Sequence, residues 1–458
     1  MERILIQDLK EEVGKEVRIN GVVNVARNQG KMAFFDFRDR TGIIQGVVFG
    51  KPEVLEIAKD LTQESAVAVT GVVNARPEKM VNANVPNGDI ELEITGIEVL
   101  NAAEAMPFDM DSDFSLDVLL DNRPLTLRRP RERAIFKIQA EITNAYATFL
   151  RSEGFTEFQA PKLVGGDAEG GAEVFKVGYF NEKTAYLATS PQLYKQIMVG
   201  VFERVFTFAT AFRAEKSATT RHLSEYTSLD IEMGFIKDHK DVMRVETALM
   251  RFIAGHLQTT CAAELNVLDM ELPLLGDASS DIFPHLKLRE AQELIYKDTE
   301  KMYGEGGGID HRNEPDLEPE EERWLCKYAN RNWGSDFIFI THYPVSKRPF
   351  YTYEDEADPG FTKSFDCLFR GVEITTGGQR VHNVEDLMKR MQMKGLKPEN
   401  FTYYLQIFKM GIPPHGGWGM GLERLTAKFC GVKNVKEATL FPRDINRIDT
   451  LLSQPTES

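Results

Sequence analysis

The chain has few cysteines, no long apolar run and no excess of positive charge, and each absence excludes a class of protein. No stretch approaches the roughly 18 apolar residues that a membrane helix needs, and the first residues lack the apolar core of a signal peptide. The four cysteines are widely spaced, without a Cys-x-x-Cys pair, at Cys261, Cys326, Cys367 and Cys430. Neither a disulfide framework nor a zinc site is therefore expected. We predict a cytoplasmic protein with reduced thiols and no membrane partner.

The charge balance limits the kind of nucleic-acid contact that is possible. The net charge is −15, which argues against indiscriminate adhesion to nucleic acid, because such adhesion needs a basic footprint. Any nucleic-acid contact must therefore be local. With 458 residues, of which 42% are hydrophobic and 27% charged, the chain has the composition of a globular protein of two or three domains.

The common nucleotide-binding motifs are also missing. There is no Gly-x-x-x-x-Gly-Lys-Ser/Thr sequence, and the glycine-rich stretch 411–425 fails as a dinucleotide fingerprint because Leu422 stands where Gly or Ala is required. The glycines of this stretch nevertheless let a backbone approach a ligand, and a helix that opens near Leu422 offers free N–H groups to a phosphate or purine. If ATP binds, it binds on a fold without a Walker motif.

Residues 1–104 predict a small OB-fold β-barrel. The segments 17–25, 32–38, 43–49, 65–75 and 90–99 are rich in β-branched and aromatic residues, are separated by turn residues, and leave one helical interlude at 52–61. Between Arg18 and Arg40, basic side chains alternate with phenylalanines, a pattern typical of single-strand nucleic-acid binding. Phe35 and Phe37 point to one side of a strand and Phe34 to the other, so one set belongs to the core. Aromatic barrel strands are more often core than binding surface.

A second domain is predicted over residues 128–458, after an acidic linker at 105–127 that has little periodicity. An amphipathic helix runs from Glu132 to about Phe149 and is followed by a strand that ends at Pro161. A further helix begins at Ser190-Pro191 and presents Gln192 and Lys195 on one face.

A β-hairpin is predicted over 205–215 and 225–235, with a short polar turn between its strands. Alternation places Arg213 and Glu215 on one face of the first strand, and Asp230 and Glu232 on one face of the second. A solvated sheet face with ion pairs would show the same pattern. The charged groups that follow elsewhere in the chain favour a binding site instead.

Oxygen-bearing side chains follow in the last third of the chain. Asp366, Glu373 and Thr376 lie on apparent strands and offer oxygen ligands of the kind that suits Mg²⁺, which also takes phosphate and water ligands. The alternative is a strand with a Gly-Gly bulge that turns its charges outward. Pro349–Thr352 reads as another strand, and residues 384–394 as an amphipathic helix.

These motifs, in order, resemble those of the class II aminoacyl-tRNA synthetases, and within them the aspartyl-tRNA synthetases of archaeal and eukaryotic type. The resemblance rests on the segments 160–161, 169–171, 190–195, 212–215, 221–223, 371–380 and 421–424. It implies an α+β protein with an N-terminal OB-fold anticodon-binding barrel and an antiparallel β-sheet catalytic domain flanked by helices. It further implies a homodimer whose interface includes the segment ending at Pro161, and activation of L-aspartate with ATP and Mg²⁺ before transfer to tRNA-Asp.

The same resemblance assigns roles to individual residues. Arg213 and Arg424 would be catalytic, and Glu373 and Thr376 would hold Mg²⁺; Thr376 replaces the serine expected in the family but keeps its hydroxyl. ATP would be bound by Arg213, Ala214, Glu215, Arg221, His222, Leu223, Glu373, Gly421, Leu422, Glu423 and Arg424. L-Aspartate would be bound by Glu169, Gln192, Leu193, Tyr194, Lys195, Arg213, Asp230, Thr376 and Arg380.

Substrate choice can be argued from charge. A side-chain carboxylate needs a buried cation, which Lys195 and Arg380 supply as a point charge and a planar fork. The amino group needs acceptors, for which Glu169, Gln192 and Asp230 are candidates. Asparaginyl-tRNA synthetase is the alternative within the class, and a non-catalytic RNA-binding protein derived from a synthetase is the alternative outside it.

The anticodon-reading positions of the family correspond to Arg27, Phe34 and Gln45. Aspartate-only members often carry tryptophan three residues after the glycine that matches Gly21, where this chain has Asn24. Charging of tRNA-Asn with aspartate, in addition to tRNA-Asp, is therefore an open alternative.

Overall fold

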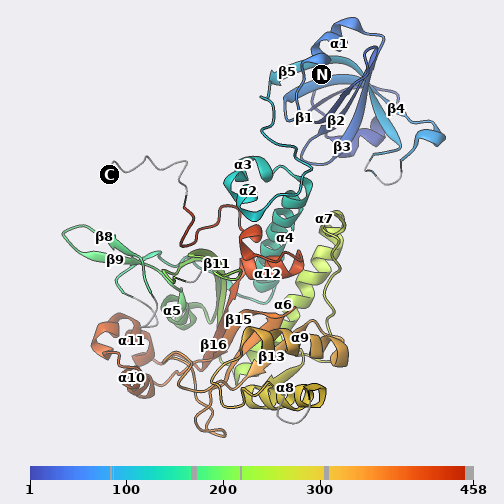
Figure 1. Cartoon of the computed structure of the whole chain (residues 1–458). Helices are drawn as coiled ribbons and strands as arrows, with labels where there is room; N and C mark the ends of the chain where they lie inside the picture. Colours follow the sequence, from blue (N-terminus) through green and yellow to red (C-terminus); the bar gives the residue numbers. More distant parts are fainter. Residues whose placement is uncertain (83–84, 86, 167–172, 217–218, 304–308, 449–458) are drawn as a thin grey trace. The chain divides into compact units, whose positions relative to one another are not determined.

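The computed structural model describes residues 1–448 except 83–84, 86, 167–172, 217–218 and 304–308. The chain divides into two compact units, Met1–Asp113 and Phe114–Ser458 (Figure 1), so the division falls inside the predicted linker. All four cysteines are buried and free. No helix among the described residues is both long enough and apolar enough to span a bilayer.

The first unit is a closed barrel in the strand order β1-β2-β3-β5-β4. Its strands are β1 (Glu16–Asn28), β2 (Met32–Arg38), β3 (Ile43–Phe49), β4 (Ala66–Ala75) and β5 (Ile90–Asn101), with α1 (Pro52–Lys59) between β3 and β4. All five predicted strands and the helical interlude are confirmed. Phe35 and Phe37 are buried in the barrel core while Phe34 is half-buried on the outer face, as alternation along a strand requires.

The predicted linker contains ordered structure that its composition did not indicate. Two short helices, α2 (Leu116–Asp121) and α3 (Arg123–Thr126), lie within residues 105–127 and belong to the second unit. The buried Arg123 guanidinium donates hydrogen bonds to the carbonyls of Glu437, Thr439 and Leu440. A charged residue thus holds this segment by contacts more than 300 residues away in sequence, which local patterns cannot reveal.

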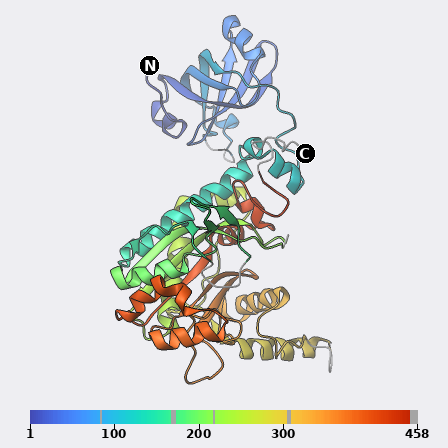
Figure 2. The same ribbon diagram turned by 90° about the vertical axis from the view of Figure 1, so that its left-hand side faces the viewer.

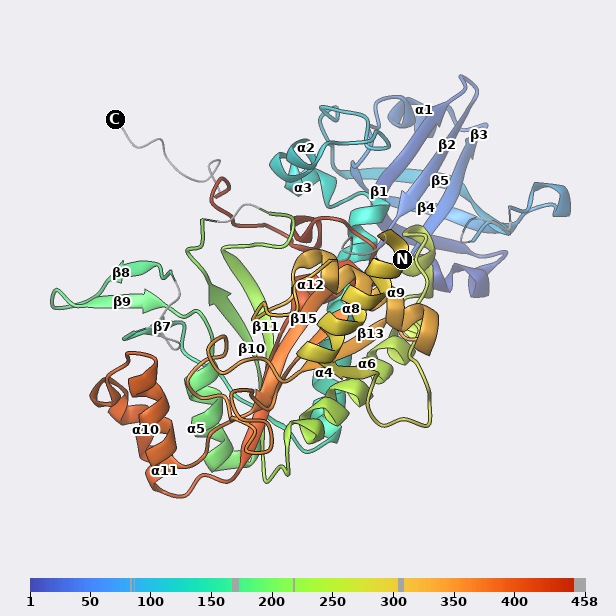
Figure 3. The same ribbon diagram turned by 60° about the horizontal axis from the view of Figure 1, so that its bottom comes forward.

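The second unit is built on a sheet of eight strands in the order β12-β13-β14-β15-β16-β11-β10-β6. The central strands are antiparallel, and only the edge pairs β12–β13 and β10–β6 are parallel. The strands are β12 (His285–Lys287), β13 (Phe337–Thr341), β14 (Ser364–Phe369), β15 (Val372–Gln379), β16 (His415–Gly421), β11 (Glu225–Gly234), β10 (Arg204–Phe212) and β6 (Thr156–Glu157). Figure 3 shows β10 beside β11, and the predicted hairpin is this β10–β11 pair.

Two long helices, α4 (Pro130–Ser152, the long teal helix in Figure 2) and α6 (His239–Thr260), pack together on one face of this sheet. On β11, Leu229, Ile231 and Met233 join their apolar core. The alternate residues of a strand point to the opposite face, so Asp230 and Glu232 point away from these helices. The helices therefore bury one face of the sheet and leave the other for polar chemistry.

The remaining elements complete the second unit. They are α5 (Gln192–Phe202), α7 (Ala262–Val267), α8 (Leu288–Tyr303), α9 (Pro319–Trp333), α10 (Val384–Met393), α11 (Thr402–Lys409) and α12 (Leu422–Phe429), with a small sheet of β7 (Leu163–Val164), β9 (Thr184–Leu187) and β8 (Lys176–Gly178). The prediction of a strand over 349–352 was wrong: only Thr352 forms an isolated bridge, with Arg380. Helix α5 begins one residue later than predicted, and the Ser190 hydroxyl accepts a hydrogen bond from the Gln192 N–H.

Candidate active site

A cavity of about 370 Å³, here called the main cavity, opens on the polar face of the sheet. Strands β11, β15 and β16, helix α5, the segment after β10 and the loop around residues 348–352 form its walls. Of the residues predicted for the site, those that line it are Gln192, Lys195, Arg213, Glu215, Arg221, His222, Leu223, Asp230, Glu373, Thr376, Arg380, Gly421, Glu423 and Arg424. The structure therefore brings together residues that are more than 200 positions apart.

Lys195 forms the centre of a buried polar cluster at one end of the cavity. Its Nζ atom donates to Asp230 Oδ2 at 2.8 Å and to the Trp418 carbonyl at 2.9 Å. The Ser228 hydroxyl donates to the other oxygen of Asp230. Because both charged side chains are almost fully buried, this geometry is fixed by the fold and does not depend on mobile surface groups.

Arg380 reaches the same cluster from the end of β15. Its Nε atom donates to Glu232 Oε1 at 2.9 Å, and its Nη2 atom to the Gly417 carbonyl at 2.9 Å. The second oxygen of Glu232 lies 3.4 Å from Lys195 Nζ. Burial opposes ionisation of Glu232, but Arg380 and Lys195 outweigh it and hold the pKa of this carboxyl below its usual value.

Glu232 is the functional residue of this cluster that sequence reasoning did not assign. The available signal was its alternation with Asp230 on β11. The neighbouring strand leaves room for it, because a Cβ atom at Gly417 would lie 2.5 Å from Glu232 Oε2. Glycine at that position lets the carboxylate sit between the two cations.

A hydrogen-bonded chain fixes Gln192 at the start of α5. Gln192 Nε2 donates to Gln196 Oε1 at 2.9 Å, and the Tyr404 hydroxyl donates to the same oxygen at 2.9 Å. The Gln196 amide contacts His415 Nε2 at 2.8 Å. Burial lowers the pKa of His415 to about 4, so its ring is neutral at pH 7. With Nδ1 donating to the Pro413 carbonyl, Nε2 is left to accept from Gln196.

The other end of the cavity is rich in guanidinium groups. Strand β10 ends at Phe212, so Arg213 and Glu215 lie in the segment after it, and not on a strand face as predicted. The Arg213 guanidinium lies 5.5 Å from the centre of the Tyr226 ring, and 3.7 Å from Glu215 Oε1. Arg221, His222 and Arg424 line the same end. Cations and an aromatic ring suit a nucleotide triphosphate.

The predicted magnesium ligands lie beside these guanidinium groups, since Glu373 Oε1 is 3.8 Å from Arg424 Nη1. The Thr376 hydroxyl donates to Glu373 Oε1 at 2.9 Å, and Thr376 pairs with Asp366 across β14 and β15. One oxygen of the buried Asp366 carboxylate has no hydrogen-bond partner, and the other accepts from Arg348 at 2.7 Å. No cluster of three or more His, Cys, Asp or Glu side chains suited to a metal occurs within the described ranges. Two protein oxygens beside the Arg424 guanidinium, a group that suits phosphate, fit Mg²⁺, which takes its other ligands from phosphate and water.

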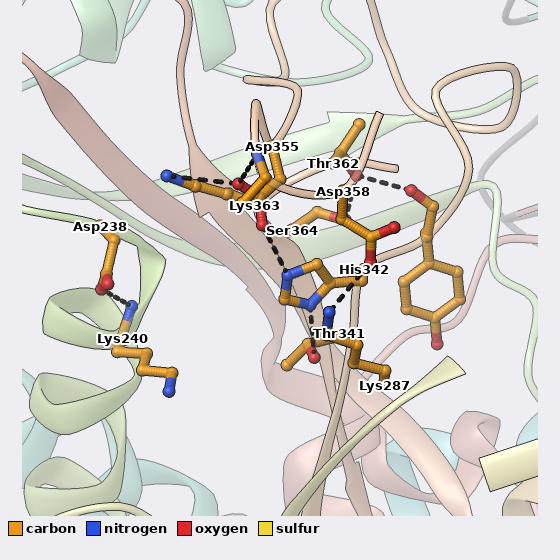
Figure 4. Close-up of polar contacts among 12 residues, drawn as sticks. Asp238, Lys240, Lys287, Thr341, His342, Asp355, Asp358, Thr362, Lys363 and Ser364 are labelled. Atoms are coloured by element: carbon orange, nitrogen blue, oxygen red, sulfur yellow. Dashed lines mark hydrogen bonds and ion pairs between the residues drawn. The ribbon is translucent and has the colours of Figure 1, made fainter. Parts of the chain in front are cut away.

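The loop between β13 and β14 supplies Arg348, Tyr351 and Thr352 to the cavity. Polar contacts at the base of this loop hold it in place. Figure 4 shows His342 between Thr341 and Asp355, with ring contacts of 2.9 Å to the Thr341 hydroxyl and 3.2 Å to Asp355. The second oxygen of Asp355 lies 3.7 Å from Lys363 Nζ. The loop is thus closed by residues from both of its ends.

Comparison with known proteins decides the family. The family described as tRNA synthetases class II (D, K and N) matches residues 115–445, which is more than half of the chain. The chain belongs to the class II tRNA synthetases. A second family, the OB-fold nucleic acid binding domain, matches residues 17–100 of this synthetase.

Individual relatives match nearly the whole length of the synthetase. The Aspartate--tRNA(Asp/Asn) ligase of Deinococcus radiodurans is 43% identical over 457 residues, 98% of this chain and 99% of its own. The protein of the same name from Thermus thermophilus is 43% identical over 97% of this chain and 99% of its own. Among solved structures, asparaginyl-tRNA synthetase from Pyrococcus horikoshii complexed with asparaginyl-adenylate superimposes with a TM-score of 0.87 at 32% identity, covering 98% of this synthetase and 99% of that chain.

Some residues predicted for the site lie elsewhere in the synthetase. Leu193 and Tyr194 pack against the apolar cluster of α10 and α11, and Leu422 is buried in the core under the sheet, so these side chains do not line the cavity. Ala214 contacts the rest of the protein through its N–H, which donates to the Glu173 carbonyl at 2.9 Å. Glu169 lies outside the described residues.

Glu423 lines the cavity, but its carboxylate is already engaged. It accepts the Thr227 N–H through both oxygens, at 3.0 and 3.1 Å. Burial raises its pKa to about 7. Its first task is therefore to join α12 to β11.

The anticodon residues predicted on the barrel lie close together on neighbouring strands. Arg27 on β1 pairs with Phe34 on β2, and Gln45 on β3 pairs with Asp36, which is on the same face of β2 as Phe34. Arg27 is exposed, Phe34 and Gln45 are half-buried, and Gln45 Oε1 accepts a hydrogen bond from Arg76. A cation, an amide and an aromatic ring are the groups that stack on and hydrogen-bond to single-stranded bases.

Proposed function

We propose that this synthetase is an aspartate–tRNA ligase, which activates L-aspartate with ATP and transfers it to the 3′ end of tRNA-Asp. The observation that carries the proposal is the pair of buried cations, Lys195 and Arg380, at the closed end of a cavity whose other end is rich in guanidinium groups. Its curated relatives from D. radiodurans and T. thermophilus bear the name Aspartate--tRNA(Asp/Asn) ligase.

The charges favour an acidic amino acid. In the free enzyme the two cations are balanced by Asp230 and Glu232. When aspartate binds, its side-chain carboxylate receives hydrogen bonds from Lys195 and Arg380, and its ammonium group takes Asp230 as acceptor, so each new charge meets its opposite. An asparagine amide would leave the lysine without an anion, and unpaired buried polar groups can discriminate by roughly 10⁴-fold.

Adenylate formation requires positioning more than proton transfer. An oxygen of the aspartate α-carboxylate attacks the α-phosphorus of ATP, the bond from that phosphorus to the bridging oxygen breaks, and pyrophosphate leaves with the electron pair. Arg213 is placed to stabilise charge on the α-phosphoryl oxygens, and Arg221, His222 and Arg424 to hold the outer phosphates. Cations placed around the phosphates supply this stabilisation without a general base.

Glu373 and Thr376 would hold Mg²⁺, which when bound neutralises charge on the ATP phosphates. The ring of Tyr226 lines the same end of the cavity and offers a stacking face to adenine. In the second step a ribose hydroxyl of the terminal adenosine attacks the aspartyl carbonyl carbon, and AMP leaves.

Three further features belong to the proposal. Arg27, Phe34 and Gln45 would read the anticodon, with Asn24 in place of the family's tryptophan extending the range to tRNA-Asn. The enzyme would act as a cytoplasmic homodimer through the segment ending at Pro161, near the sheet edge at β6. Domain limits of 1–104 for the barrel, 105–127 for the hinge and 128–458 for the catalytic domain are proposed, with helices α2 and α3 of the hinge packed as part of the second unit.

Asparagine is the second candidate substrate, and the observation that supports it is the similarity to the P. horikoshii asparaginyl enzyme. Aminoacylation of purified tRNA-Asp and tRNA-Asn with radiolabelled aspartate or asparagine separates the two. We expect aspartate to be attached to both tRNAs and asparagine to neither. Attachment of asparagine alone would overturn the proposal.

A further inference from the structure

A second cavity, of about 390 Å³, lies next to the main cavity and is strongly cationic. Its lining includes Arg221, Arg323, Arg370, Arg424, Lys428 and Lys433 and contains no Asp or Glu. These side chains come from the segment before β11, helix α9, the β14–β15 turn, helix α12 and the residues after it. Such a concentration of positive charge in a concave surface attracts a polyanion.

Half of these cations already have a carboxylate. Arg221 contacts Glu322 at 2.8 Å, Arg370 contacts Asp336 at 3.1 Å and Arg424 contacts Glu373 at 3.8 Å.

The other three cations of the second cavity have no carboxylate partner. Within the described part of the chain, Arg323, Lys428 and Lys433 form no ion pair. Surface lysines are usually solvated without consequence, but Lys428 is half-buried, and burial lowers its pKa. An anion in the cavity would supply the charge that Lys428 lacks.

The turn between β14 and β15 shapes the cavity. Arg370 and Gly371 both have positive φ, at 46° and 82°, as a tight two-residue hairpin turn requires. A Cβ atom on Gly371 would lie 3.0 Å from Arg323 Cγ, so the stem of Arg323 packs directly against this turn. Packing thus holds the base of the Arg323 side chain beside the cavity, while its guanidinium group stays exposed to an anion.

The two cavities share a wall. Arg221, His222, Arg424 and Val435 line both of them. An anion that leaves the outer-phosphate end of the main cavity therefore meets the second cavity without losing contact with Arg221 and Arg424.

We propose that the second cavity binds inorganic pyrophosphate, the leaving group of adenylate formation, as a station on its way out of the enzyme. This inference rests on the proposed function, because that reaction supplies the pyrophosphate. Arg323, Lys428 and Lys433 belong to this station and not to the site of ATP, since none of them lines the main cavity.

The test combines a direct titration with an exchange assay. Inorganic pyrophosphate is titrated calorimetrically into the full-length protein without amino acid or ATP, and the KM for pyrophosphate is measured in aspartate-dependent ATP–pyrophosphate exchange. The variants are Arg323→Gln and Lys433→Gln, both at exposed positions. The matched controls are Arg331→Gln and Lys327→Gln, exposed on α9 outside the cavity.

We expect each variant to weaken pyrophosphate binding and to raise its KM about fivefold, the effect of one exposed ion pair of about 1 kcal/mol. The KM values for ATP and aspartate should stay within about twofold of wild type, and the controls should match wild type. Pyrophosphate affinity that is equal in variants and wild type overturns the inference.

Two other outcomes separate the possible failures. A raised KM for tRNA with an unchanged KM for pyrophosphate would assign the cations to RNA phosphates and would also overturn the inference. Absence of aspartate-dependent exchange in the wild-type protein would instead overturn the proposed function. The titration still reports on the cavity in that case, because it requires no amino acid.

Discussion

Lys195 on α5 and Arg380 after β15 contact the same carboxylate, that of Glu232, at 3.4 and 2.9 Å. Neither cation is free to turn, because Lys195 also donates to Asp230 and Arg380 to the Gly417 carbonyl. The pair forms a preorganised receptor for an anion, in which the arrangement of the cations has been determined by folding.

Removal of the Lys195 charge should lower the activity with aspartate and leave the affinity for ATP nearly unchanged. For Lys195→Met we expect kcat/KM for aspartate to fall about 10²- to 10³-fold, as for loss of a buried charged hydrogen bond, with the KM for ATP within about threefold. Steady-state exchange kinetics measure both. Lys162→Met is the control. Lys162 interacts electrostatically with Asp230, but it does not line the cavity. Equal losses for the two substrates would refute the assignment of this pocket.

Glu232 should contribute to stability as well as to binding. Glu232→Gln leaves two buried cations with one carboxylate fewer, and we expect the free energy of unfolding to fall by about 3–5 kcal/mol. Urea unfolding at pH 7 measures it. Glu225→Gln, at the exposed end of the same strand, should change it by less than about 0.5 kcal/mol. A variant at position 232 as stable as wild type would show that the carboxylate does not organise the cations.

The Mg²⁺ requirement should depend on a hydroxyl at position 376 and not on whether the residue is Thr or Ser. Chelation of Mg²⁺ should stop adenylate formation in the wild-type enzyme. Thr376→Ser keeps the oxygen and should leave the Mg²⁺ concentration for half-maximal exchange within about twofold of wild type. Thr376→Val removes it and should raise that concentration about tenfold or more. Identical Mg²⁺ curves for the Ser and Val variants would exclude Thr376 from the metal site.

The buried Glu246 carboxyl should make the free energy of unfolding depend on pH. Burial between α6 and the sheet raises the pKa of this carboxyl to about 8, from an ordinary 4.5, although Thr375 and Cys367 oppose the shift. The folded protein therefore holds this proton more tightly than the unfolded chain does. Its contribution is complete below pH 4.5 and is lost as the pH rises to about 8.

Glu246→Gln cannot lose that proton and removes the effect. Relative to the variant, wild type should lose about 1.4 kcal/mol of stability per pH unit between pH 5 and 7. Urea unfolding of both proteins over this range gives the difference directly, because other titrating groups cancel. A difference that does not change with pH would mean that Glu246 is ionised in the folded protein.

Local patterns in the sequence predicted the barrel strands and the β10–β11 hairpin, and together with the family resemblance they predicted half of the side chains that line the main cavity. They did not predict the partners of those side chains. Lys195 meets Asp230 across 35 residues and the Trp418 carbonyl across 223, and such contacts exist only in the assembled sheet. The same reason hid Glu232, whose role depends on two cations from other elements.

The residues at which strands end could not be predicted from local sequence patterns either. Alternation along the strand predicts Arg213 on a strand face, but β10 ends one residue earlier, so the segment that carries Arg213 and Glu215 leaves the sheet and lines the cavity. Leu193 and Tyr194 belong to the same motif, 190–195, as Lys195, and the family resemblance therefore predicts them in the site. On a helix, adjacent residues point in different directions, and these two pack into the neighbouring apolar cluster.

Amino-acid-dependent ATP–pyrophosphate exchange by the wild-type enzyme, with aspartate and asparagine compared at equal concentrations, tests the central claim most directly. It needs no tRNA and reports only on the cavity that holds Lys195, Arg380 and Arg213. The account predicts exchange with aspartate and at least about 10³-fold lower kcat/KM with asparagine. Exchange stimulated by asparagine and not by aspartate would contradict it.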